Sequence, residues 1–483
     1  MAFLQKFRED LVRPALFFGN NPVSLIGGAL TTAAAMTLIG FWVVDIFGHG
    51  GSTNPYLGIL VDLLLPGVFI LGLLLIPFGM WLHRRSLRAK GRLPEAYPQI
   101  NLADPIFRRG IEFVLAATCV NFILVGTASY RGVAYMDSPN FCGQACHVMY
   151  PEYTAYQHSA HSHVACAECH IGSGIGSAVR AKVNGTKQLM EVVLHRYPTP
   201  IVASGNSLRP ANEVCASCHA PGRFAGDKLS VKTTYADDEH NTKTQSVVMV
   251  HVGGQDARGQ LSGIHGAHMG HIEYIATDAG RATIPWVMRR NADGSETVFA
   301  TAAARSLVSK NEVPKGEQRT MDCIDCHNRA AHSFVTAEEA LNSAMDAGTV
   351  SPQLPWIHKE GLTLLRSNYA NEEDARARIP AQLTAFYRKS HPEVLQSQAA
   401  QLKSTGEKLA TLYSQNVFPF MKVTWGTHPN NIGHNSYPGC FRCHDGDHTN
   451  KSGAAITNDC AACHNLLAVD ETNPKLLTEF GLQ

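Results

Sequence analysis

Six clusters of two cysteines followed at once by a histidine run through the last two-thirds of this 483-residue chain. Five clusters have two residues between the cysteines, which is the spacing of a c-type haem attachment site, and the first cluster has three. In such a site each thiol adds to one vinyl group, and the histidine becomes the proximal iron ligand. The attachment cysteines are Cys142, Cys146, Cys166, Cys169, Cys215, Cys218, Cys323, Cys326, Cys440, Cys443, Cys460 and Cys463, and the proximal histidines are His147, His170, His219, His327, His444 and His464.

The number of cysteines agrees with this interpretation. The chain has 13 cysteines, and six pairs use 12 of them, which leaves Cys119 alone. A zinc ribbon needs cysteine pairs, but its chemistry does not require a histidine after every second cysteine. A disulfide scaffold would not repeat that histidine either, and such scaffolds are usually much shorter. The sequence therefore predicts six covalently bound haem c groups.

Haems that only transfer electrons need a second axial ligand, and 17 of the 23 histidines are not part of a motif. We favour histidines that lie close to a motif or in glycine-rich loops, together with a methionine two residues after the first proximal histidine. These candidates are Met149, His161, His163, His265, His268, His332 and His434. For each of them, an ordinary surface or packing residue is the alternative. We interpret His83, His358 and His391 as non-ligands.

The first 130 residues have a different composition. Val23–Phe47 and Tyr56–Leu82 are apolar runs long enough to cross a hydrocarbon core of about 30 Å, and Phe113–Ser129 is a shorter third run. Buried core helices are the alternative, but the first two runs are too long and too uniformly apolar. A cleaved signal peptide is not favoured, because more than 20 residues precede the first run and two further runs follow it.

Charge placement predicts the orientation of these spans. The segment His83–Gly110 is rich in arginine and lysine, whereas Gly48–Pro55 has neither. By the positive-inside rule the N-terminus faces the cytoplasm, and three crossings place the haem domain outside. We expect a bacterial inner-membrane protein with a periplasmic haem domain and the lipid bilayer as a partner. No basic stripe with interleaved aromatic residues indicates a nucleic-acid partner.

We predict a mainly α and loop-rich fold, with a three-helix transmembrane anchor followed by a multihaem cytochrome c domain that carries a small β insert. The expected parts are an anchor over residues 1–130, with spans at about 23–47, 56–82 and 111–129, a four-haem core over 131–335 with the insert at about 220–320, a helical segment over 336–415 and a two-haem segment over 416–483. In the insert, Ser246–Val252 is a run rich in β-branched residues, which predicts a strand. Arg281–Arg290 leads through a turn into Thr297–Thr301, which predicts a hairpin.

From Asp137 to His332 several stretches match one known pattern. They are Phe141–Met149, Glu152–His161, the Cys166 motif with Lys182 and Lys187 downstream, and Cys323–His332, with an apolar span just before the first motif. In these stretches the chain resembles the NapC/NirT family of membrane-anchored quinol dehydrogenases. It departs from the family's usual four haems and single helix, and is more similar to larger inner-membrane multihaem cytochromes.

The resemblance implies a function. A first haem at the membrane surface would oxidise a membrane quinol, and the other haems would relay electrons to a periplasmic acceptor protein or reductase of a respiratory chain. It also implies that Met149 ligates the first haem and His332 the second. Lys182, Lys187 and Glu191, on a helix expected after the second motif, are candidates to contact the quinol headgroup. A solvated helix face is the alternative for each of them.

Two other functions remain open. The chain could be a structural electron-transfer hub in a larger membrane complex, without its own quinol site. The three-span anchor, with Asp45 and Asp62 near its outer end, would then serve subunit packing. A terminal reductase would need a haem with an open sixth position, and the many spare histidines argue against it.

Overall fold

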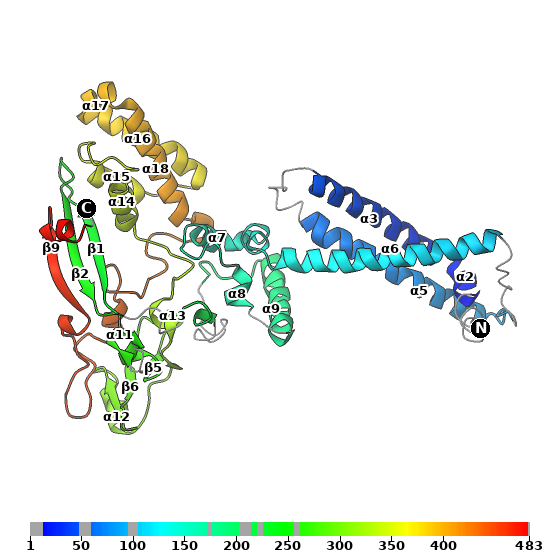
Figure 1. Cartoon of the computed structure of the whole chain (residues 1–483), viewed down its shortest axis with the longest axis horizontal. Helices are drawn as coiled ribbons and strands as arrows, with labels where there is room; N and C mark the ends of the chain where they lie inside the picture. The colour runs from blue at the N-terminus through cyan, green and yellow to red at the C-terminus, as the bar shows by residue number, and fades with distance from the viewer. Residues whose placement is uncertain are drawn as a thin grey trace. The chain divides into compact units, whose positions relative to one another are not determined.

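The computed structural model describes residues 13–47, 59–94, 105–171, 175–201, 214–219, 226–255 and 261–481. The chain divides into two compact units, Met1–His147 and Val148–Gln483. Figure 1 labels their helices and strands. The first unit is helical, whereas the second combines short helices, three small sheets and long connecting segments.

The first unit contains helices α2 (Arg13–Gly19), α3 (Pro22–Phe47), α5 (Leu65–Ala89) and α6 (Pro105–Met136), with a π-helix over Ile59–Leu64 and another over Phe141–Ala145. Helices α3 and α5 pack closely because small residues face one another. A Cβ on Gly27 would lie 2.7 Å from the carbonyl oxygen of Gly72, and the Ser24 hydroxyl donates to the Ile76 carbonyl at 2.8 Å. Such contacts hold helices together where lipid offers no hydrophobic driving force.

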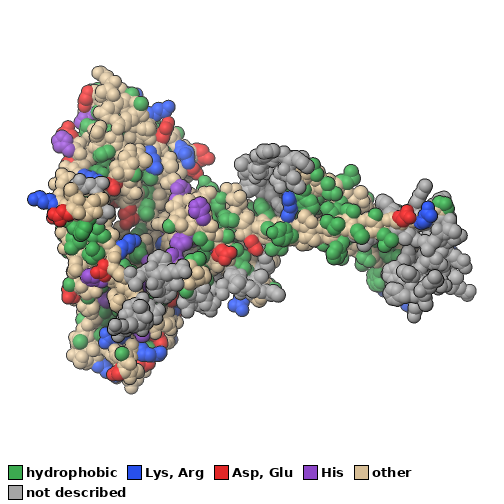
Figure 2. Space-filling view, viewed as in Figure 1, with side chains coloured by type: hydrophobic (Ala, Val, Ile, Leu, Met, Phe, Trp, Pro, Cys, Tyr) green, Lys and Arg blue, Asp and Glu red, His purple; other side chains and the backbone are tan. Residues whose placement is uncertain are grey.

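Pro22–Val43 of α3 and Leu65–Ala89 of α5 are long and apolar enough to cross a membrane, by length and composition. These helices match two of the predicted spans, although α5 begins later than Tyr56 and ends beyond Leu82. The third predicted span lies within α6, and its crossing stays a prediction. Figure 2 shows hydrophobic side chains gathered over these helices, and Phe122 of α6 is 82% exposed. An apolar surface of this kind fits contact with lipid.

The second unit has three sheets, all antiparallel. One sheet has the order β1 (Lys228–Tyr235), β2 (Lys243–Val250), β9 (His464–Glu471). Another has the order β7 (Glu296–Ala300), β6 (Trp286–Arg290), β5 (Ile272–Ala276), β8 (Glu317–Thr320), and the two-residue strands β3 (Gly254–Gln255) and β4 (Leu261–Ser262) form the third. The predicted strand and hairpin are confirmed as β2 and as β6 paired with β7. The pairing of β9 with β2 joins the C-terminal segment to the insert.

The predicted helical segment is confirmed as α14 (Ala337–Asp346), α15 (Ile357–Leu365), α16 (Glu372–Ser390), α17 (Pro392–Ser397) and α18 (Ala399–Asn416). Helix α14 begins after the N-cap Thr336, since Thr336 and Glu339 form a capping box. Helices α17 and α18 are separated at Gln398, whose backbone leaves the helical region. The fully buried Leu341, Leu383 and Leu409 belong to the core that packs these helices together.

The remaining elements are short and surround the motifs. They are η4 (His147–Met149), α7 (Tyr150–Gln157), α8 (Cys166–His170), α9 (Ile175–Val193), α11 (Gly263–His268), α12 (Arg305–Ser309), α13 (Cys323–Cys326), η7 (Pro419–Met421), η8 (Gly439–Arg442), η9 (Cys460–Ala462) and α19 (Lys475–Glu479). Most of these elements are single helical turns, so long connecting segments make up much of the second unit.

Candidate functional site

Each regular motif lies on a single helical turn. In the third, fourth and fifth motifs the amide of the proximal histidine donates to the carbonyl of the first cysteine, at 2.7 Å for His219, 2.8 Å for His327 and 3.1 Å for His444. This turn places two thiols three residues apart and the following histidine on one side of the backbone. That is the arrangement needed to hold one haem by two thioether bonds and one iron bond.

The first motif fits its extra residue by a different turn. Residues Phe141–Ala145 form a π-helix, in which the amide of Cys146 donates to the carbonyl of Phe141 at 3.2 Å. A π-turn closes over one more residue than an α-turn. The longer spacing between Cys142 and Cys146 is therefore absorbed locally.

Five proximal histidines face a second histidine. The ring centres are 5.9 Å apart for His161 and His219, 6.2 Å for His170 and His332, 6.3 Å for His265 and His327, 5.8 Å for His268 and His444, and 6.0 Å for His434 and His464. A metal–imidazole bond is about 2 Å long and the nitrogen lies about 1 Å from its ring centre, so two rings on opposite sides of one iron have centres about 6 Å apart. The five pairs fit a haem iron between them.

Hydrogen bonds orient several of these rings. The Nδ1 atoms of His161, His268, His332 and His444 lie 3.0, 2.7, 2.9 and 2.5 Å from the backbone carbonyls of Ala330, Ile264, Glu152 and Thr457. A carbonyl only accepts, so Nδ1 carries the proton and Nε2 keeps a lone pair for a metal. Burial also lowers the pKa of His268 and His332, which favours the neutral form that metal binding requires.

Consecutive motifs lie next to each other. The thiols of Cys215 and Cys323 are hydrogen-bonded, which raises the pKa of Cys215 and lowers that of Cys323 to about 7. The pKa of Cys169 is raised mainly by burial, and Cys218 of the third motif contributes.

The fourth, fifth and sixth motifs also lie next to one another. Burial raises the pKa of Cys326 to about 11, and Cys440 of the fifth motif adds to this shift. Burial likewise raises the pKa of Cys463, and again Cys440 contributes. The second to sixth motifs therefore follow one another in space in their sequence order.

One short helix serves two sites. His265 and His268 both lie on α11, and their rings pair with those of His327 and His444. Helix α11 begins at Gly263. The positive φ of 64° at Gly263 and its close approach to Gly253, with a Cβ only 2.6 Å from the Gly253 Cα, leave no room for a side chain. Helix α11 thus holds His265 and His268 in a fixed relation to each other.

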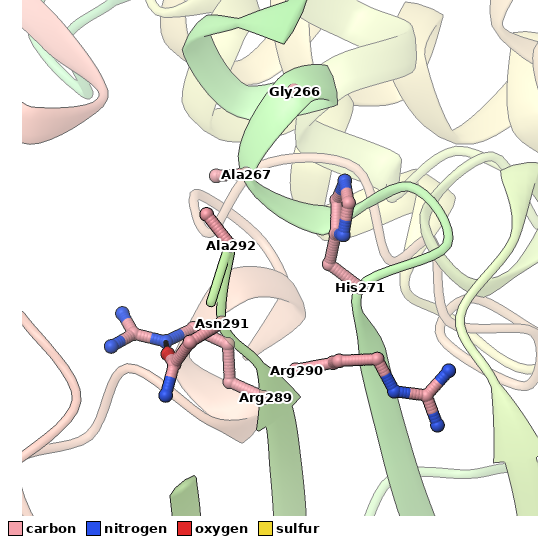
Figure 3. A pocket seen from close by; sticks show the side chains of 7 residues that line it. All are labelled: Gly266, Ala267, His271, Arg289, Arg290, Asn291 and Ala292. Atoms are coloured by element: carbon pink, nitrogen blue, oxygen red, sulfur yellow. Dashed lines mark hydrogen bonds between the residues drawn. The ribbon is translucent and has the colours of Figure 1, made fainter. Parts of the chain in front are cut away.

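Gly266 and Ala267 of α11 line a pocket of about 280 Å³, together with His271 and residues around the end of β6. In Figure 3, Gly266 and Ala267 face this pocket, whereas Arg289 and Arg290 point in different directions. Arg289 bonds Asn291 at 2.9 Å, and Arg290 lies 3.4 Å from Glu273. The cationic groups therefore do not converge on one ligand.

A buried carboxylate lies inside the fourth motif. Asp325 has a side chain that is 1% exposed, and it accepts from the hydroxyl of Tyr274 at 2.5 Å and from Arg281 at 2.8 Å. Its backbone carbonyl accepts from Arg442 of the fifth motif at 2.7 Å. A buried charge needs such partners. The network fastens the fourth motif to the fifth and to the hairpin sheet.

The first motif has a different environment. Among the described residues, the His147 ring has no contact with a second histidine ring. Met149 is partly buried against a cluster that includes Val148 and Phe334. His163 is exposed and contacts no proximal ring within the described part of the chain.

The predicted quinol-site residues lie on α9, where Lys187 and Glu191 form an ion pair at 3.8 Å. The side chain of Lys182 and those of Asp45 and Asp62 lie outside the described residues. The three predicted non-ligands have other partners, since Nδ1 of His358 bonds Asp237 at 2.7 Å, that of His391 lies 3.2 Å from Glu393 and that of His83 lies 3.2 Å from the Phe18 carbonyl.

Sequence reasoning missed the residues inside the motifs, namely Asp325, Phe441 and Arg442. Their position between two haem-linked cysteines could have drawn attention to them. It also missed His428, which is 3% exposed, accepts from Arg329 at Nδ1 and packs against the ring of Phe334 at 4.6 Å. His428 is not part of an attachment motif, and no sequence pattern indicates that it is buried.

Apolar anchor helices followed by haem attachment motifs with facing histidines define a membrane-anchored multihaem cytochrome c. The model of the NapC/NirT cytochrome c family, N-terminal region, matches residues 107–213. The cytochrome c-type protein ImcH of Geobacter sulfurreducens is 37% identical over 468 residues, which cover 95% of this chain and 91% of that protein. The cytochrome c-type protein NrfH of Wolinella succinogenes is 33% identical over 103 residues, 20% of this chain and 57% of that protein. No solved structure matches.

The chain belongs to the NapC/NirT family of membrane-anchored multihaem cytochromes c, as the resemblance in the motifs predicted. Proteins of this type are anchored in the inner membrane, and α3 and α5 fit that anchoring. Members of the family interact with quinol and with periplasmic redox partners.

Proposed function

We propose that this protein is a six-haem cytochrome that oxidises a membrane quinol and passes the electrons to a periplasmic acceptor protein or reductase. The observation that carries the proposal is the set of five histidine pairs about 6 Å apart, arranged along motifs that adjoin one another in sequence order. Bound haem c supplies a one-electron carrier at each motif.

We assign axial ligands to five sites, and the histidine pairs support this assignment. His332 serves the second site, His161 the third, His265 the fourth, His268 the fifth and His434 the sixth, each opposite the proximal histidine of that motif. His163 is then left out. Met149 is assigned to the first site on its spacing of two residues from His147. Two imidazoles per iron leave no position for a substrate, which supports electron transfer rather than a terminal reductase.

The order of the motifs along the chain suggests a direction for electron transfer. The first motif directly follows α6, which places it next to the anchor in sequence, and the sixth motif lies at the far end of the series. We infer that electrons enter at the first site and leave at the sixth. The basic segment His83–Gly110 supports a cytoplasmic N-terminus, which puts the haem unit in the periplasm.

Helix α9 is the proposed quinol contact. Val179, Val183 and Met190 are 58%, 65% and 53% exposed and recur at positions that share one face of the helix. Lys187 and Glu191 lie on the same helix, and their paired charges are suited to bind a headgroup and accept its protons. An apolar face beside polar groups fits a lipid-soluble ligand whose reacting end is polar.

The same sites fit the second candidate, a hub without its own quinol site. The anchor favours this candidate. Its helices α3 and α5 pack through small residues such as Gly27 and Gly72, and they expose apolar side chains that further subunits could contact. The two functions differ in what the isolated chain can do.

The test uses the purified full-length protein in detergent. Intact mass is expected to show six haems, and a reduced quinol analogue is expected to reduce them, with a quinone-site inhibitor slowing the reaction. Reduction by dithionite but not by the quinol analogue would favour the hub. A mass with five haems would remove the first motif from the proposal, because its spacing is the irregular one.

A further inference from the structure

The two residues between the cysteines of the fifth motif reach towards different neighbours. Arg442 donates to the backbone carbonyl of Asp325 in the fourth motif at 2.7 Å. The ring of Phe441 stacks on the ring of His434, with centres 4.4 Å apart and planes at 20°. His434 in turn faces His464 of the sixth motif. One side chain therefore contacts the preceding site and the other contacts the following site.

His434 lies on a loop that is fastened at its base to the fifth motif. The amide of Cys440 donates to the carbonyl of Gly433 at 3.1 Å, which closes the loop directly beside His434. Within the described residues no hydrogen bond holds the His434 ring, whereas the distal rings of His161, His268 and His332 each have a backbone carbonyl at Nδ1. The contact that orients the His434 ring is its stack on Phe441.

We propose that Phe441 is the positioning residue of His434, and that it couples the fifth site to the sixth. This inference rests on the proposed ligand pair His434 and His464. Stacked aromatic rings prefer a defined offset geometry, so Phe441 restricts the rotation of the His434 ring. It thereby fixes the angle between the two imidazole planes, which is 34° between His434 and His464. The residue inside one attachment motif sets the axial ligand of the next.

The test compares Phe441→Leu, which keeps an apolar side chain but loses the flat ring, with Phe441→Tyr, which keeps the ring. Phe441 is 48% exposed, so its replacement does not remove a core residue. In Phe441→Leu we expect carbon monoxide to compete for one haem of the reduced protein with an affinity raised roughly 2- to 10-fold, the factor that the loss of one aromatic pair gives. One low-spin signal in the electron paramagnetic resonance spectrum of the oxidised protein should also shift. Phe441→Tyr should restore both readouts.

A second variant separates this inference from the ligand assignment. His434→Ala should convert one haem to a high-spin form that binds carbon monoxide. If it does not, the ligand pair itself is wrong. If it does, and Phe441→Leu matches the wild type in both readouts, only the role of Phe441 is overturned. Intact mass is measured for every variant, and if Phe441→Leu lacks a haem, Phe441→Met provides the ring-free comparison under the same two criteria.

Discussion

At the scale of single residues, the sites depend on polar groups that are buried beside the motifs. Asp325 is one of these, with a side chain that is 1% exposed between Tyr274 and Arg281. A buried ion pair adds little stability compared with a well-packed apolar pair, but removal of one partner leaves the other charge uncompensated. Any change that removes the charge of Asp325 is therefore expected to lower the free energy of unfolding.

We expect Asp325→Asn to lower the free energy of unfolding by about 3–5 kcal/mol, because Arg281 keeps a charge that is no longer balanced. Thermal unfolding of the purified protein measures the effect. The matched control is Asp346→Asn, which breaks the exposed ion pair with Lys243 at 2.7 Å and should cost at most about 1 kcal/mol. Equal losses in the two variants would contradict the account of the buried network.

His428 carries the second residue-scale prediction, on pH. Burial, then the charges of Arg329 and His332, lowers the pKa of His428 from its ordinary 6.5 to about 4. The folded state therefore resists protonation, and stability falls as the pH drops from about 6.5 to about 4. In His428→Phe this loss disappears, so the unfolding free energy should fall less over that range, by up to about 3 kcal/mol. Denaturant unfolding at several pH values measures how the unfolding free energy depends on pH. The same dependence in the wild type and in His428→Phe would refute the prediction.

At the scale of elements, short loops and turns place the distal histidines. Gly439 illustrates how tightly the loop of His434 closes. Its φ is +48°, and a Cβ would lie 1.6 Å from the carbonyl oxygen of Gly433. Both the left-handed backbone and the lack of space require glycine here.

We expect Gly439→Ala to displace the loop and to release His434, with an increase in high-spin haem seen by absorption spectroscopy. The matched control is Gly453→Ala. Gly453 has a φ of +84° but nothing within 4 Å of its Cβ, so only the backbone cost of about 1–2 kcal/mol applies. A low-spin spectrum in Gly439→Ala like that of Gly453→Ala would show that the loop adapts without loss of the ligand.

The motif positions, the two long apolar helices, the hairpin and the N-cap at Thr336 could be predicted from sequence, because each depends on residues close together in the chain. The pairing of histidines could not. His161 lies five residues before Cys166, yet its ring faces His219 of the third motif. The pairing of β9 with β2 joins segments more than 200 residues apart, and no local pattern indicates such a contact.

At the scale of the whole molecule, the proposed function requires a quinol contact and a path away from it. We expect Lys187→Gln to slow haem reduction by a quinol analogue about 100- to 1,000-fold, the factor that the loss of one group stabilising developing negative charge gives, and to leave reduction by dithionite unchanged. Stopped-flow absorption measures both rates.

The control for Lys187→Gln is Lys403→Gln. Lys403 forms an ion pair with Glu407 at 3.9 Å, four residues away on α18, which matches the pair of Lys187 and Glu191 at 3.8 Å on α9. This variant should reduce at the wild-type rate with both donors. Unchanged quinol-driven reduction in Lys187→Gln would remove this lysine from the proposed site.

The facing histidines also bear on how the protein is made. A chain that is exported from its N-terminal side presents His161, His265, His268 and His434 before the motifs that they face, so those four sites can acquire both axial ligands as soon as each motif emerges. His332 is the reverse case, because it lies 162 residues after its partner His170. Under the proposed ligand assignment and orientation, the second site waits with one ligand until export has passed the fourth motif.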